Sequence, residues 1–501
     1  MSLYVIGIGG TGAKCIEALT HVCAAGLMPE QEVFALFVDP DRANGSLDRA
    51  RVTLQQYAHC NKLSLGKTPF FRSTITTPEQ NDLWSPINNQ QATLGQTFNY
   101  NVLTKKEPEA TKLFDVLFSE RERTTRLDRG FRGHPSIGAA VLAQTIQLGQ
   151  EDPWRTLRDR VRRDARTGKK VNVFLFGSIF GGTGAAGFPT IARLIRDELK
   201  TLTADDNTKT NGSSEERRST VRLGGALVLP YFSFIPQDGN KELRASSEDF
   251  LMSTQAALKS YHRHHGNLYD RVYLLGDSML SPVEHFSTGA EEQRNEPHFI
   301  ELYAALAAVD FCSWDGKGQP FPMIARNESD KLTWRDLPDS ETVRTRLGQL
   351  ARFAFSYRFV YSDMLKDIHD RGKAYRAPWY INYFERKSVR LDNEALTTLD
   401  EVREYAESLL AWLHDLHTSA EQQTIELINW QAFIGDRGEG LRFDPEGFGK
   451  LVYPIGKVDP NALNSLWEKV SAYKVQDEQA RDLGRFIRAL YECCAVDRAN
   501  A

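Results

Sequence analysis

The chain lacks several features that would place it quickly in a functional class. No apolar run approaches the roughly 20 residues that a membrane-spanning helix needs. With 62 basic and 66 acidic residues, the formal charge is -4, so the basic excess typical of nucleic-acid-binding proteins is missing. Its six cysteines have no metal-ligand spacing, and the adjacent Cys493 and Cys494 suit neither a disulfide nor a zinc site. We therefore expect a cytoplasmic protein with reduced thiols and with neither a membrane nor a nucleic acid as partner.

The amino-terminal part of the chain alternates strand and helix patterns. LYVIGI and EVFALFVD are short apolar runs, and the intervening AKCIEALTHVCAAG has the spacing of an amphipathic helix. No basic segment precedes the first run, so we expect a buried strand there and not a signal peptide. Alternation of this kind predicts a parallel sheet with helices on both faces.

Later segments continue this pattern and then depart from it. Residues 45–125 have weaker periodicity and many Gln, Asn and Thr residues, so we interpret them as a partly helical insertion. The stretch HFIELYAALAAVDF is apolar nearly all round, which predicts a buried helix. From about residue 370, stretches such as LDEVREYAESLLAWLHDL predict a separate, mainly helical C-terminal region.

Two glycine-rich loops each join a strand pattern to a helix pattern. They are GIGGTGAK, residues 7–14, and GSIFGGTGAAGFP, residues 177–189. Glycine lets backbone N–H groups approach a phosphate closely, and the start of the following helix adds further donors. No G-x-x-x-x-G-K-[ST] motif is present, which argues against a Walker-type P-loop. The first loop alone fits the dinucleotide fingerprint G-x-G-x-x-G, with Asp39 placed for a ribose hydroxyl, but such an enzyme does not require the second loop.

The second loop resembles the signature G-G-G-T-G-[ST]-G of the tubulin and FtsZ superfamily of GTPases. Residues 180–186 match four of its seven positions, and Pro189 stands where bacterial members carry a proline. Ala185 and Ala186 replace the hydroxyl residue and the last glycine of that signature. These departures could weaken phosphate binding and suggest a divergent prokaryotic member.

Further motifs resemble those of the superfamily in the same order along the chain, over about residues 1–350. They are the first phosphate loop at 7–12, the second loop at 38–41, the γ-phosphate-sensing loop at 129–138, the ribose-side strand and turn at 228–232, and the central helix at 298–312. The resemblance implies an α/β fold in which a tubulin/FtsZ-like nucleotide-binding domain, with a parallel sheet and a buried central helix, precedes a divergent mainly helical C-terminal region. The implied boundaries are 1–295 for the GTP-binding domain with its insertion, 296–315 for the central helix, 316–365 for an acidic-loop and helix segment, and 366–501 for the helical region.

The resemblance also implies which residues bind GTP or GDP with Mg²⁺. They are Gly9, Gly10, Thr11, Gly12, Asp39, Arg132, Gly133, Gly181, Gly182, Thr183, Gly184, Asp238, Arg244, Asn295 and Phe299. Asp238 and Arg244 would serve the ribose, Phe299 would stack on the base, and Asn295 or Glu301 would read its edge. The alternative for Phe299 is a core position. Tyr303 stands four residues after Phe299, so the family's aromatic-to-amide spacing is absent and guanine specificity is implied by the resemblance alone.

In the superfamily, acidic residues after the central helix complete the neighbouring subunit's site for hydrolysis. The matching stretch, ARNESDKLTWRDLPD, offers Asn327, Glu328, Asp330 and Asp336 as candidate catalytic residues, because a carboxylate can orient water and accept its proton. A solvated acidic loop is the alternative. The implied protein is a GTPase that assembles head to tail with copies of itself into filaments, and its helical region could bind another protein. A GTP-binding scaffold or switch subunit that does not polymerise is the alternative, and an NAD-binding Rossmann enzyme is less favoured.

Overall fold

The computed structural model describes most of the chain. The described residues are 2–29, 32–63, 68, 70–79, 82–87, 92–128, 130–131, 134–146, 150–206, 221–234, 247–265, 267–277, 280–283, 295–316, 334–371, 377–418, 429, 433–434, 442–443, 448, 451, 462–475 and 482–495. Among these residues, no helix is both long enough and apolar enough to cross a membrane.

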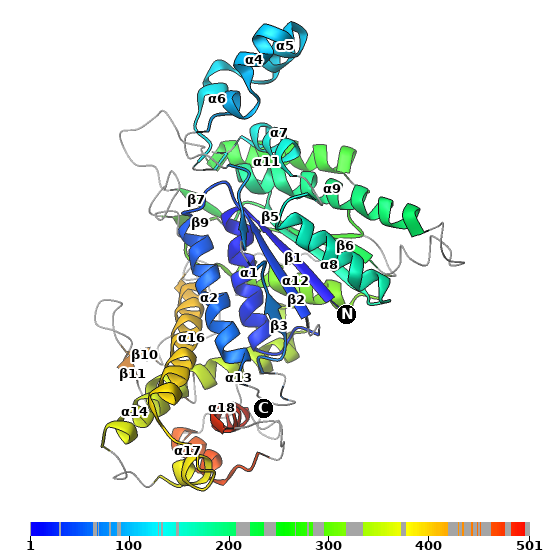
Figure 1. The fold of residues 1–501 in the computed structure, drawn as a ribbon. Coiled ribbons are helices and arrows are strands. Elements are labelled where there is room, and N and C mark those ends of the chain that lie inside the picture. Colours follow the sequence, from blue (N-terminus) through cyan, green and yellow to red (C-terminus); the bar gives the residue numbers. More distant parts are fainter. Residues whose placement is uncertain are drawn as a thin grey trace.

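A parallel sheet of seven strands forms the centre of the molecule (Figure 1). Its order is β3-β2-β1-β5-β6-β8, and β4 also pairs with β2. The strands are β1 (Ser2–Ile8), β2 (Glu32–Val38), β3 (Thr74–Thr76), β4 (Leu83–Trp84), β5 (Val171–Ser178), β6 (Val221–Val228) and β8 (Arg271–Leu275). The predicted α/β class with a parallel sheet is therefore confirmed.

The central strands are buried on both faces, as expected of a parallel sheet covered by helices. Every residue of β1, β5 and β6 is buried. Successive side chains point to opposite faces, so Leu3 and Val5 enter one hydrophobic core while Tyr4 and Ile6 enter a second. This two-sided burial explains why the strands are nearly continuous apolar runs.

Each face of the sheet has its own set of helices (Figure 1). The first core contains α1 (Gly9–Ala24), α2 (Gly45–Asn61) and α12 (Phe299–Ser313). The second contains α7 (Pro135–Thr145), α8 (Trp154–Arg166) and α9 (Gly182–Asp206), with α11 (Ser247–His265) packed against it. The helix predicted over 298–312 is thus present, and most of its residues are buried. Two short strands, β7 (Phe232–Phe234) and β9 (Ser281–Val283), pair outside the main sheet.

Part of the predicted insertion over 45–125 belongs to the core. The helix α2 packs on α1 through Leu47, Ala50 and Leu54, and β3 and β4 extend the sheet. Only the following short helices project from the body as an arm (Figure 1). They are α4 (Tyr100–Lys106), α5 (Pro108–Leu117) and α6 (Glu120–Thr124), while α3 (Leu94–Thr97) precedes them and buries Leu94 in the second core.

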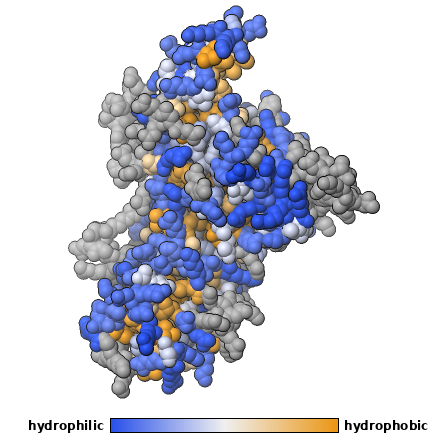
Figure 2. Space-filling model, in the orientation of Figure 1, coloured by the Kyte–Doolittle hydropathy of each residue, from blue (hydrophilic) through white to orange (hydrophobic). Residues whose placement is uncertain are grey.

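Aromatic side chains of the arm extend the second core, and other apolar side chains of the arm are exposed. Phe114 packs against Phe98, Tyr100 and Phe118. On the outer side of α5, Val116 is 83% exposed, and apolar colour is visible on the arm in Figure 2. The other exposed apolar residues of the arm are Val102, Leu113 and Leu117.

The C-terminal region is mainly helical over its described residues, and it shares the first core. Its helices are α13 (Ser340–Ser356), α14 (Ser362–Arg371), α15 (Pro378–Tyr380), α16 (Asn393–Thr418), α17 (Ala462–Ala472) and α18 (Asp482–Cys493), with π-helical turns at Tyr357–Tyr361 and Ile381–Glu385 and the short strands β10 (Phe433–Ile434) and β11 (Arg442–Phe443). Hydrophobic side chains from α1 through α16 to α18 form one continuous cluster. The region predicted as separate is therefore packed onto the sheet domain through α1 and α2.

A buried histidine lies between α1 and α16. The ring of His21 is fully buried, its Nδ1 is 3.1 Å from the hydroxyl of Tyr405, and its centroid is 4.7 Å from that of Trp412. Burial, reinforced by the positive charge of Arg49, lowers the pKa of His21 to about 3. The imidazole is therefore neutral in the folded protein at neutral pH.

This histidine predicts a loss of stability in mild acid. Below about pH 6.5 the unfolded chain binds a proton at His21 that the folded chain does not bind until about pH 3. The free energy of unfolding should therefore fall as the pH decreases from 6.5, by at most about 1.4 kcal/mol per pH unit from this group. His21→Phe should flatten that dependence in urea unfolding, whereas Tyr405→Phe, which keeps the imidazole, should not. Equal pH slopes in the wild type and His21→Phe would contradict the assignment.

Candidate functional site

The two glycine loops leave adjacent strands at the same edge of the sheet. Strand β1 ends at Ile8 and α1 begins at Gly9, whereas β5 ends at Ser178 and α9 begins at Gly182. β1 pairs directly with β5. From β1 the sheet continues to β2, and from β5 it continues to β6 in the opposite direction. In open α/β sheets, ligands bind outside the carboxyl ends of the strands at such a reversal of strand order.

The loops touch each other at this edge. A Cβ atom placed on Gly9 would lie 3.4 Å from the Cβ of Thr183 and 3.6 Å from the backbone N of Gly184. Gly9 also has a φ of +74°, a left-handed conformation that favours glycine. The two loops therefore lie within van der Waals distance of each other, and the backbone conformation at position 9 favours glycine.

Two helix starts face the space beside this contact. Helix α1 begins at Gly9 after Ile8, whose apolar side chain cannot cap the first N–H groups of the helix. Gly10, Thr11 and Gly181 are only half-buried, so this part of both loops is accessible. Each helix start carries a partial positive charge, and together they favour a bound anion.

The loop after β2 adds an acidic corner to the site. Asp39 is only 4% exposed, and its carboxylate accepts hydrogen bonds from the N–H of Asp41 at 2.9 Å and from the side chain of Asn44 at 3.4 Å. Asn44 also caps α2, and its Nδ2 lies 3.1 Å from where a Cβ on Gly10 would be. Asn44 therefore links the acidic corner to the first glycine loop.

Burial, together with the neighbouring charge of Asp41, raises the pKa of Asp39 to about 8 against the hydrogen bonds from Asp41 and Asn44 that lower it. A buried carboxyl group of this kind is neutral at pH 7 unless a positive charge approaches it. Asp39 can therefore donate a hydrogen bond as a neutral acid, or bind a cation once it loses its proton.

Lys14 does not reach into the site, although it follows the first glycine loop. Its side chain is 3% exposed and forms an ion pair with Glu301 of α12, which is fully buried. Its Nζ also donates to the carbonyl of Glu296 at 3.1 Å. The hydroxyl of Tyr231 donates to the same carboxylate at 2.6 Å. Lys14 therefore joins α1 to the start of α12.

The same network connects the first glycine loop to α12. Burial raises the pKa of Tyr231 well above its usual range, and the nearby side chain of Thr11 counters this shift. The second oxygen of Glu301 accepts the N–H of His298 at 2.9 Å, as part of a capping box. With both oxygens engaged, Glu301 does not have the free edge that its suggested role in reading a base would need.

A second cation holds the chain just before α12. Arg49 of α2 pairs with Glu17 of α1 at 2.9 Å and donates to the carbonyl of Asn295 at 3.1 Å. Lys14 and Arg49 thus fix two consecutive carbonyls, those of Asn295 and Glu296. The start of α12 is therefore tied to the helices that follow the first glycine loop and the acidic corner.

The structure brings most of the described candidates together at one edge. The residues of this cluster are Gly9, Gly10, Thr11, Gly12, Asp39, Gly181, Gly182, Thr183 and Gly184. Within it, Gly12 and Gly184 serve packing, because a Cβ there would lie 2.7 Å from Gly7 and 2.6 Å from Ser178 backbone atoms. Seven candidates lie outside the described residues, namely Arg132, Gly133, Asp238, Arg244, Asn327, Glu328 and Asp330.

Asn295 and Phe299 flank the start of α12. Asn295 is half-buried. Phe299 is 7% exposed and its ring centroid is 4.4 Å from that of His298 and 6.2 Å from that of Tyr303. These contacts favour the core interpretation of Phe299 over stacking on a base.

Asp336 lies beside the first half of α12 and not beyond its carboxyl end. It ends a short 3-10 helix, Trp334–Asp336, and its carbonyl accepts the hydroxyl of Tyr303 at 2.7 Å. Tyr303 is one turn into α12. This placement differs from the expected loop after the central helix, which would face a neighbouring subunit.

Sequence patterns did not identify several residues that organise the site. Asn44 and Arg49 lie outside the glycine motifs. Lys14 ends the first motif, but the sequence did not suggest its ion pair with Glu301. One signal was present: Glu301 and Asp310 are the only charged residues of α12, and a carboxylate buried there needs a cation. Which cation supplies the charge depends on tertiary packing.

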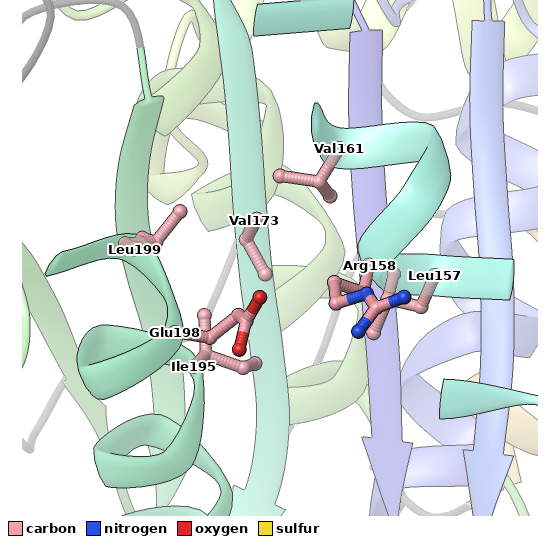
Figure 3. A pocket seen from close by; sticks show the side chains of 7 residues that line it. All are labelled: Leu157, Arg158, Val161, Val173, Ile195, Glu198 and Leu199. Carbon is pink, nitrogen blue, oxygen red and sulfur yellow. The ribbon is translucent and has the colours of Figure 1, made fainter. Parts of the chain in front are cut away.

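A small apolar cavity lies elsewhere, between α8, β5 and α9 (Figure 3). Its lining residues are Leu157, Arg158, Val161, Val173, Ile195, Glu198 and Leu199. Its volume of about 30 Å³ is enough to hold a water molecule. Among the described residues, no group of three or more His, Cys, Asp or Glu side chains could hold a metal ion.

Comparisons with known proteins add no assignment. No protein-family model matches the chain. No curated protein matches it either.

The raised pKa of Asp39 predicts an unusual pH dependence. Between about pH 4 and 8 the unfolded chain loses a proton from Asp39 that the folded chain keeps, so the free energy of unfolding falls as the pH rises. Asp39→Asn mimics the neutral acid and should remove this pH dependence. The free energy of unfolding of the variant, relative to that of the wild type, should therefore rise with pH by up to about 1.4 kcal/mol per pH unit.

Urea unfolding of the ligand-free protein across this pH range tests the expectation. The exposed Asp48, also on the segment after β2, provides the matched control Asp48→Asn. A stability difference between Asp39→Asn and the wild type that stays constant with pH would show that Asp39 is ionised in the folded chain.

Proposed function

We propose that this chain is a GTP-binding protein of the tubulin/FtsZ type that assembles head to tail, with hydrolysis completed between subunits. The observation that carries the proposal is the contact between two glycine loops on the adjacent strands β1 and β5. Two helix starts that face one space can bind several phosphate groups from two sides. A single loop of this kind would suit a shorter anion.

The described residues offer candidate ligands for the phosphates and for Mg²⁺. We assign the phosphates to the N–H groups of Gly10, Thr11 and Gly181, because these residues line the accessible part of both loops. Asp39 and Asp41, both buried at the end of β2, carry carboxylates of the kind that bind Mg²⁺ through water. Bound Mg²⁺ would neutralise phosphate charge.

The choice of GTP over a dinucleotide rests on the second loop. The strand order β3-β2-β1-β5-β6-β8 is equally that of a Rossmann domain, so the fold alone does not separate the two. A dinucleotide-binding domain uses the loop after its first strand. It leaves unexplained why the loop after β5 is also rich in glycine and reaches Gly9.

A non-polymerising scaffold that binds GTP is the second candidate, and two observations favour it. Ala185 lacks the hydroxyl that the family's signature carries. Asp336 lies beside Tyr303, on the first half of α12, instead of beyond the end of the helix. Both features are compatible with nucleotide binding and slow turnover.

Nucleotide binding is tested by calorimetric titration with Mg²⁺ and GTP, GDP, ATP or NAD. GTP should bind, and Gly181→Asp should weaken it at least about tenfold because a carboxylate would repel the phosphates at short range. The matched control is Thr167→Glu, which adds an acid on an exposed residue near the amino end of β5, at the opposite edge of the sheet. Binding of NAD but not GTP, or equal effects of the two variants, would contradict the proposal.

Assembly is tested by sedimentation and phosphate release across protein concentrations. Pelleting with GTP but not GDP, with turnover per molecule that rises with concentration, is the expected result. GTP binding without either would reject head-to-tail assembly and leave the scaffold.

A further inference from the structure

The helix after the second glycine loop lacks one of its own hydrogen bonds. Pro189 lies inside α9 and has no N–H group. The carbonyl of Ala185, four residues earlier, therefore cannot receive the usual helical hydrogen bond. Ala185 is buried, and a buried carbonyl without a partner is costly.

A tyrosine from a different helix fills this gap. The hydroxyl of Tyr261 on α11 donates to the carbonyl of Ala185. Nearby, the hydroxyl of Tyr269 donates to the carbonyl of Phe188 at 2.6 Å. The rings of Tyr269 and Phe188 are also stacked, with their centroids 4.7 Å apart. The segment from α11 to β8 thus holds the first two turns of α9.

The same two turns are tightly packed on their other sides. A Cβ on Gly187 would lie 2.6 Å from Ile8, and a Cβ on Gly138 of α7 would lie 2.6 Å from Ala186. The start of α9 is therefore clamped between β1, α7 and α11. A small displacement of Ala185 would have to move the N–H groups of the preceding residues with it.

The direction of the carbonyl and N–H groups in α9 determines how Tyr261 can act on the second glycine loop. Carbonyl groups of a helix point toward its carboxyl end, and N–H groups point toward its amino end. Tyr261 therefore holds Ala185 from the side opposite to the loop, and it acts through Ala185.

We propose that Tyr261 is a positioning residue for the second glycine loop, because its hydroxyl supplies the hydrogen bond that Pro189 removes. In this way it fixes the first turn of α9, where the N–H of Ala185 donates to the carbonyl of Gly181, and so holds the N–H group of Gly181 in the orientation that binds phosphate. This assignment rests on the proposed nucleotide site.

A double-mutant cycle in the full-length chain tests the proposal. Pro189→Ala restores an N–H that can bond to Ala185, so it should rescue Tyr261→Phe. Tyr261→Phe alone should weaken GTP binding about fivefold to tenfold and lower the urea midpoint. In the Pro189→Ala background, Tyr261→Phe should change neither the GTP affinity nor the urea midpoint. Tyr269→Phe is the matched control, because the carbonyl of Phe188 keeps the N–H of Ala192 as its regular helical partner.

The outcomes separate the two proposals. GTP affinity is measured at a temperature at which every variant is folded, so a merely structural role for Tyr261 would shift the urea midpoint and leave the affinity unchanged. Equal effects of Tyr261→Phe and Tyr269→Phe, or a loss that persists with Pro189→Ala, would overturn the positioning role. A wild type that binds no GTP would overturn the proposed function and the phosphate-positioning role together, while the stability cycle would still decide whether Tyr261 replaces the missing N–H.

Discussion

The parallel pairing of β1 with β5 is the constraint on which the rest of the structure depends. It places the ends of two buried strands next to each other, and the chain leaves them toward opposite sides of the sheet. Because each strand leads within a few residues into a helix, two helix starts meet at one edge. Gly9 lies next to the second loop, where a Cβ would be 3.4 Å from that of Thr183, and its positive φ favours glycine at this position.

Buried charge connects this edge to the remainder of the chain. Lys14 and Arg49 each pair with a buried carboxylate and also hold a carbonyl at the start of α12. Such pairs are costly to break because the remaining charge would be left uncompensated. Near the carboxyl end of α1, His21 packs against Tyr405 and Trp412 of α16. A change at the glycine loops therefore has a physical route to α12, through Thr11 and Tyr231, and a second along α1 to the C-terminal helices.

Regular patterns predicted much of the fold, whereas the contacts of the site were less accessible from sequence. The alternating strands, the apolar helix α12 and the two glycine loops follow from local periodicity and composition. Helix α2 was assigned to an insertion because its buried residues, such as Leu47 and Leu54, are spaced among many polar ones. The pairing of Lys14 with Glu301 and of Tyr261 with Ala185 joins residues far apart in the chain, and no local pattern encodes it. For Phe299 the sequence could not distinguish two roles, because an aromatic residue at the start of a helix can pack in a core or stack on a base.

The central claim is that the two glycine loops form one nucleotide site. Hydrogen–deuterium exchange with and without GTP and Mg²⁺ tests it most directly, since amide protons at both helix starts are the proposed ligands. The account predicts that peptides covering residues 7–14 and 177–189 become protected together, at the same GTP concentration. Protection of residues 7–14 alone, or of neither loop under conditions in which GTP binds, would contradict it.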